Sequence, residues 1–161
     1  MLTGAKLAKN YKRNATIIKW QADGLSHADS LIQTPYRINC LNWVLGHIAE
    51  GRDGALEMVG ADRVAEPGEL DRYLYESEPI LEEEPGVLPL ERLLEIISAT
   101  QERLEAALSE LSPEDLAVEM TEEERTTTLA DRVHFAYFHD TYHTGQTELL
   151  RQIAGKSDHI I

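Results

Sequence analysis

The sequence predicts an all-α protein, a four-helix bundle with a long crossover between its second and third long helices. Four long stretches repeat apolar residues at helical spacing, and capping residues, glycines and prolines separate them. An alternating strand pattern is not expected anywhere in the chain. Such amphipathic helices are most simply buried as a bundle. The chain has 161 residues, enough for one ordinary domain and too few for two, so we expect a single domain over residues 1–161.

The first two helices are expected in the N-terminal third of the chain. Residues 2–22 carry an apolar face and are followed by Gly24, a helix-terminating residue. Ser26 begins a short helical turn. Thr34 and Pro35 resemble an N-cap and a first helical residue, which predicts a second helix over residues 35–59.

A long connection should follow the second helix. Residues 61–87 contain two proline–glycine pairs and an acidic run at 82–84, and we interpret them as a crossover with one short helical piece around residues 69–75. The acidic run lacks the ligand spacing of a calcium loop and is expected to be solvated.

The last two helices have the clearest signals. From residue 90 to residue 111, leucine and isoleucine alternate spacings of four and three, with Gln101 as the only polar member of the seam. A minor turn begins at Ser112. Thr128 and Asp131 form a capping-box pattern that predicts a fourth helix over residues 129–154.

Charge and composition exclude several classes of partner. The formal net charge is −14, which disfavours nucleic acids and anionic membranes. No apolar run approaches the length of a membrane span, and the N-terminal residues lack the pattern of a secretory signal. A single cysteine, Cys40, excludes an internal disulfide. We therefore expect a soluble cytoplasmic protein.

Two histidines stand four residues apart in the fourth predicted helix. On a helix this spacing corresponds to one turn and about 40° of rotation, so His139 and His143 project from one face, as two metal ligands on a single helix must. Phe135, Gln146 and Leu150 lie close to His139 around the helix and give a stripe that could face the core. His134 lies nearly opposite His143 and is excluded from the site.

A third histidine lies within the apolar stripe of the second helix. On its own, His47 is more simply explained as a hydrogen-bonded core residue than as a ligand. Three core-facing imidazoles are nevertheless costly to bury unless a shared cation satisfies them. The residues alone leave both interpretations open.

The segments around these histidines resemble a known family. The motifs NWVLGHIAEGRD and HDTYHTGQTELLRQ are similar to the two signatures of the DinB-like four-helix proteins, in the same order along the chain. The resemblance implies that His47, His139 and His143 are the metal ligands. Three neutral imidazoles leave coordination positions open. Zinc or nickel suits them best, and manganese and iron stay open.

The resemblance also implies chemistry with low-molecular-weight thiols. The leading hypothesis is a metal-dependent thiol S-transferase that acts on small electrophiles, a small-molecule substrate class. One alternative is a metal-dependent hydrolase, and another is a non-enzymatic ligand-binding or stress-response dimer. No catalytic residue is assigned, and a homodimer is expected from the resemblance.

Other polar residues near the predicted site have simpler explanations. Glu50 is one turn from His47 and is more simply an exposed helical carboxylate than a general base. Asp140 should point away from His139. Cys40 is two turns before His47, about 10 Å of rise and too far for direct ligation, so we expect a buried, inert thiol.

Two structural explanations each are considered for one glutamine and two tryptophans. Gln101 is expected either to hydrogen-bond a metal-ligating histidine or to pair with a polar core group such as Asn14. Trp20 and Trp43 are expected to be core or interface anchors rather than a platform for substrate.

Overall fold

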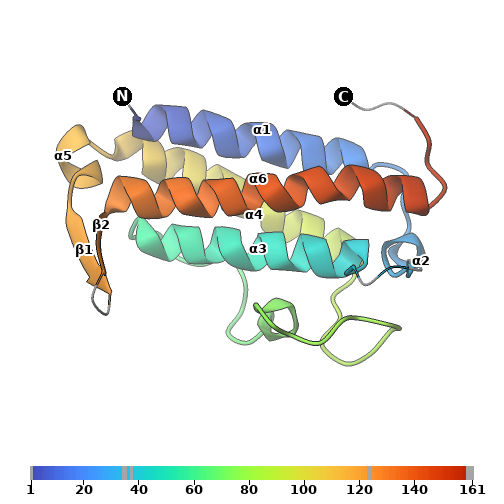
Figure 1. Ribbon diagram of the computed structural model, residues 1–161. Helices are drawn as coiled ribbons and strands as arrows, with labels where there is room; N and C mark the ends of the chain where they lie inside the picture. Colours follow the sequence, from blue (N-terminus) through green and yellow to red (C-terminus); the bar gives the residue numbers. More distant parts are fainter. Residues whose placement is uncertain (1, 34–35, 37, 123–124, 159–161) are drawn as a thin grey trace.

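Four long helices form a bundle, as the sequence predicts (Figure 1). The structure is a computed structural model and describes residues 2–33, 36, 38–122 and 125–158. The four helices are α1 (Gly4–Ala22), α3 (Leu41–Met58), α4 (Leu90–Glu110) and α6 (Leu129–Ile153).

The order of packing explains the long crossover. Helix α1 packs against α4 and α6, and α3 packs against the same two helices, so α1 and α3 lie diagonally across the bundle. Helices α3 and α4 are neighbours that run in the same direction (Figure 1). Two parallel neighbours require a connection that returns along their whole length. The segment between α3 and α4 makes this return below the bundle in the view of Figure 1.

Most predicted helix ends are close to those observed, and one is wrong. Helix α1 starts after the N-cap Thr3, and α6 starts at the predicted capping box of Thr128 and Asp131. Helix α3 begins at Leu41 after the N-cap Cys40, six residues later than predicted from the Thr34–Pro35 pair, which lies outside the described residues. Residues 38–40 have no regular secondary structure, and the backbone of Cys40 is extended where the helix begins.

The short elements include one that the sequence analysis missed. Helix α2 (His27–Ser30), the 3-10 turn η1 (Asp71–Tyr73) and helix α5 (Pro113–Leu116) lie where short turns were predicted. Strands β1 (Glu119–Glu122) and β2 (Arg125–Thr128) form an antiparallel hairpin, which corrects the expectation of no strand. The hairpin projects from one end of the bundle (Figure 1), so it has little apolar face to produce an alternating pattern. Its signal was the run of β-branched threonines at 126–128.

A layer of polar side chains crosses the centre of the bundle between two apolar clusters. Arg52 of α3 is 1% exposed and donates hydrogen bonds to Asp140 of α6 and to the carbonyl oxygen of Tyr11 of α1. Gln101 of α4 accepts from Arg52 Nη1 at 3.4 Å. Gln101 therefore pairs with a polar core group, which was one of the two roles expected for it. The group is Arg52 rather than Asn14, and Gln101 does not bond a histidine of the cluster.

No helix in the described part of the chain is long and apolar enough to cross a bilayer.

Candidate metal centre

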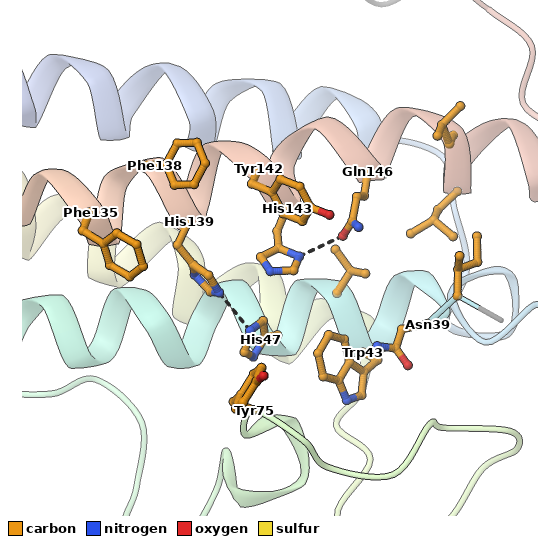
Figure 2. Close-up of a pocket in the computed structure, with 14 residues that line it drawn as sticks. Asn39, Trp43, His47, Tyr75, Phe135, Phe138, His139, Tyr142, His143 and Gln146 are labelled. Atoms are coloured by element: carbon orange, nitrogen blue, oxygen red, sulfur yellow. Dashed lines mark hydrogen bonds between the residues drawn. The ribbon is translucent and has the colours of Figure 1, made fainter.

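The three predicted histidines meet in one place between α3 and α6 (Figure 2). His47 projects from α3 toward α6, and His139 and His143 project from successive turns of α6 toward α3. One nitrogen of each ring lies within 4.8 Å of the others, and Nε2 of His47 is 3.0 Å from Nε2 of His139. His47 is buried, whereas His139 and His143 are partly exposed on an open side.

Hydrogen bonds at the far nitrogens orient two of the rings. Nδ1 of His47 donates to the carbonyl oxygen of Tyr73 at 2.8 Å, and Nδ1 of His143 donates to the amide oxygen of Gln146 at 2.8 Å. A proton on Nδ1 puts the lone pair of each ring on Nε2, and Nε2 of His47 shares a hydrogen bond with Nε2 of His139 (Figure 2). This arrangement of a ring nitrogen held by an oxygen acceptor is typical of metal-ligating histidines.

The donor set fits a divalent cation. Two imidazole nitrogens bound to one tetrahedral zinc ion at ordinary bond lengths lie about 3.3 Å apart, close to the 3.0 Å between His47 and His139. Burial, followed by the adjacent rings of His143 and His47, lowers the pKa of His139 to about 4. Burial also lowers the pKa of His143. Both rings are therefore neutral near pH 7, the protonation state that binds a metal.

Small residues of α3 allow the close approach of these groups. A Cβ atom at Gly46 would lie 2.0 Å from Cδ1 of Tyr73, so glycine at this position lets the crossover place the Tyr73 carbonyl beside His47. A Cβ atom at Gly51 would lie 3.4 Å from Nδ1 of His139. Glycine at position 46 is therefore needed for the contact with the crossover, whereas a Cβ at position 51 would only touch His139.

Asp140 lies on the opposite side of α6 from the three imidazoles, as predicted. Its carboxylate accepts from Arg52 Nε at 2.7 Å and from Asn14 Nδ2 at 2.7 Å inside the bundle. The carboxylate thereby belongs to the structural network of the core and is directed away from the imidazole side of α6.

An open cavity of about 620 Å³ lies in front of the histidines. Its wall is formed largely by α6 side chains that are mostly exposed: Phe135 is 69% exposed, Phe138 58% and Tyr142 60%. Tyr75 of the crossover covers the side next to His47 (Figure 2). Phe135 lines this cavity, which corrects the expectation that it faces the core.

Sequence reasoning missed most of this aromatic wall. Residues 135, 138, 142 and 149 are apolar or aromatic at spacings of three, four and seven, a helical stripe beside the HxxxH pair that could have been recognised. No comparable signal identifies Tyr75, because it enters the site from an irregular connection.

The two tryptophans differ from each other. Trp43 is buried, stacks on His47 with ring centroids 4.7 Å apart, and donates from Nε1 to Ser77. It therefore contacts the histidine cluster as well as the core. Trp20 is 50% exposed and is not a core residue.

The remaining candidates lie outside the cluster. His134 is exposed, and the cluster contains only the three histidines among the residues described. Glu50 lines a separate small hollow with Arg63 and Leu74, and burial raises the pKa of its carboxyl. Cys40 is 1% exposed, as predicted, and burial raises the pKa of its thiol.

The fold and the site together define a helical-bundle protein with three histidines positioned to bind a metal ion. The chain belongs to the DinB superfamily, whose family model matches residues 22–147, a span that includes all three histidines. Among solved structures, it is similar to a crystal structure described as the conserved protein of locus from Enterococcus faecalis. The TM-score is 0.75 and the identity 14%, with 97% of this chain and 100% of that chain covered. That likeness shows the fold. The comparison with curated proteins found no significant match.

Proposed function

We propose that His47, His139 and His143 hold one divalent metal ion, zinc or nickel, and that the protein is a metal-dependent thiol S-transferase acting on small electrophiles. The observation that carries the metal proposal is the convergence of three imidazole nitrogens within 4.8 Å, with two of the rings oriented by hydrogen bonds at Nδ1. Three protein ligands leave room for a further ligand, which is typical of a catalytic site.

The metal would supply a lowered pKa to a thiol in the cavity, so that the thiol reacts as a thiolate. The sulfur forms a bond to the electrophilic carbon, the leaving group departs with the electron pair of the broken bond, and the thiol proton passes to solvent. The protein's own part is to orient the rings through Tyr73 and Gln146 and to shield the reacting atoms with the aromatic wall.

The lining of the cavity favours thiol transfer over hydrolysis. None of its residues, all within the described chain, is an aspartate, a glutamate or a cysteine. Metal-dependent hydrolysis commonly uses a carboxylate as general base. Thiol transfer has no such requirement, because the lowered pKa of the thiol replaces the base.

Metal analysis of protein purified without an affinity tag tests the site. We expect about one equivalent of metal in the native chain, a loss of most of it in His47→Ala, and no loss in His134→Ala, whose imidazole is outside the cluster. Equal and near-zero metal in the native chain and His47→Ala would overturn the metal proposal.

The activity needs a separate experiment. Alkylation of low-molecular-weight thiols by a chromogenic electrophile should be accelerated by the metal-loaded protein and not by His47→Ala. Failure to accelerate alkylation of any thiol tested would overturn the transferase proposal and favour the non-enzymatic ligand-binding alternative. The homodimer expected from the family resemblance stays a proposal, which light scattering of the purified protein can test.

A further inference from the structure

Strong apolar exposure is concentrated around the histidines. Phe135, Phe138, Tyr142 and Leu149 of α6 are each more than half exposed, and Tyr75 of the crossover is 81% exposed. All five line the cavity in front of the imidazoles. Contiguous exposed apolar surface is unfavourable in water and usually marks a binding site. The cavity, about 620 Å³, is within the range of small-molecule sites.

The same lining contains no charged side chain in the described chain. Its polar groups are the imidazoles, the amides of Asn39 and Gln146, two tyrosine hydroxyls and the indole N–H of Trp43, which donates to Ser77. The arginines of α3 and of the crossover are held elsewhere: Arg52 by Asp140, Arg63 by Asp53 and Arg72 by Glu84. Arg132 and Arg151 of α6 do not line the cavity. A carboxylate, phosphate or sulfonate placed against the aromatic wall would lose its hydration without gaining a cationic partner.

The net charge of the whole chain also disfavours the binding of anions in the cavity. The formal net charge of −14 repels anions that approach the cavity. In the proposed function, a divalent cation on three neutral imidazoles with one bound thiolate keeps one positive charge at the histidines. An anionic group packed against the aromatic wall, away from that ion, would have no charged side chain as a partner.

We propose that the electrophile taken by this cavity is an uncharged molecule with an aromatic body that packs against the aromatic wall of α6 and Tyr75. This inference rests on the proposed function for the reaction and adds the class of substrate. Aromatic rings prefer offset or edge-to-face contact with other rings, and the side chains of Phe135, Phe138 and Tyr142 offer such contacts at the mouth of the cavity. The amides of Asn39 and Gln146 can hydrogen-bond a neutral polar substituent.

Two fluorescent probes with the same ring skeleton test the charge preference. N-phenyl-1-naphthylamine is uncharged, and 8-anilinonaphthalene-1-sulfonate adds one sulfonate. In fluorescence titrations of the metal-free protein, where the lining has no charged side chain, we expect the sulfonate to bind about tenfold more weakly or worse. Equal binding of the two probes, tighter binding of the sulfonate, or no binding of either would overturn the proposal.

A pair of matched variants distinguishes the effect of a charge inside the cavity from the effect of the net charge of the protein. Leu149 lines the cavity and is 61% exposed, whereas Val118 lies outside it and is 54% exposed. Leu149→Lys and Val118→Lys add the same charge, and neither position is buried. We expect Leu149→Lys to strengthen sulfonate binding about tenfold relative to Val118→Lys. Equal effects of the two variants would show that only the net charge matters and would overturn the proposal.

A second copy of the chain is the competing occupant of this surface. Light scattering over the concentration range of the titrations detects it. If probe binding decreased as a dimer formed, the aromatic wall would be an interface, and the proposal would fail. Metal uptake is measured separately. If the protein prefers the uncharged probe but takes up no metal, the metal site is contradicted and the charge preference is not. Protein that holds metal and alkylates thiols but prefers the sulfonate contradicts the charge preference alone.

Discussion

Arg52 and Asp140 form a two-pronged ion pair at the centre of the bundle, with Nε 2.7 Å from Oδ1 and Nη2 3.1 Å from Oδ2. The side chains are 0% and 3% exposed. Asp140 directly follows His139, so the ion pair on one side of α6 restricts the rotation of the helix that directs His139 and His143 toward His47. The stability of the core and the geometry of the site are thus linked through two adjacent residues.

Removing the negative charge of this pair should destabilise the protein strongly. Asp140→Asn leaves the Arg52 guanidinium buried without a full counter-charge, and we expect the free energy of unfolding to fall by about 3 kcal/mol. Urea denaturation of the metal-free protein measures it. As a control, Glu105→Gln breaks the surface pair of Lys12, 60% exposed, with Glu105, 44% exposed. It should cost at most about 1 kcal/mol. Similar small losses in both variants would contradict the prediction.

Two glycines of α3 should respond in opposite ways to alanine. Gly46→Ala places a Cβ atom 2.0 Å from the buried ring of Tyr73. We expect a loss of about 1–3 kcal/mol in the free energy of unfolding. Weaker metal binding should accompany it, because the Tyr73 carbonyl orients His47. Gly54→Ala, in the same helix, meets no atom within 4 Å and should stabilise the protein by about 0.5–1 kcal/mol. Denaturation and metal titration of both variants measure these effects. Equal stability and equal metal affinity of the two variants would contradict the prediction.

Acid should destabilise the metal-free protein through the histidine cluster. Burial and the adjacent rings lower the pKa of His139 to about 4 in the folded chain, whereas an unfolded histidine has a pKa of about 6.5. Between these values the unfolded state binds more protons, so the free energy of unfolding decreases as the pH falls through this window. Above about pH 7 the contribution is constant, because both states are neutral.

Denaturation of the metal-free native chain and of metal-free His139→Asn at several pH values checks this linkage. The native chain should lose more stability than the variant between about pH 6.5 and pH 4.5, since asparagine does not titrate. Identical slopes in the two proteins would show that His139 does not carry the effect.

The Cys40 thiol should be unreactive in the folded protein. It is 1% exposed, and burial raises its pKa, so little thiolate forms near neutral pH. A colorimetric disulfide reagent should label it slowly in buffer and completely in denaturant. Cys40→Ala should leave the metal content unchanged, because the thiol is not part of the histidine cluster. Rapid labelling of the folded chain, or loss of metal in this variant, would count against a purely structural role.

Local patterns in the sequence determined the helices and half of the site. Leucine spacing and the capping residues identify α4 and α6, because an amphipathic helix repeats along its own length. The spacing of His139 and His143 is likewise a property of one helix. The predicted start of α3 is wrong because the Thr34–Pro35 pair has the sequence pattern of a helix N-cap. The β1–β2 hairpin gives no alternating pattern because it has little buried face.

Only the tertiary structure decided how these parts meet. It brings His47 within reach of the HxxxH pair from a position 92 residues away in the chain, and it places the carbonyl of Tyr73 behind that ring. It also pairs Gln101 with Arg52 instead of a histidine and turns Phe135 toward an open cavity instead of the core. Each of these relationships depends on the rotation and register of one helix against another, which long-range packing sets and local sequence spacing does not encode.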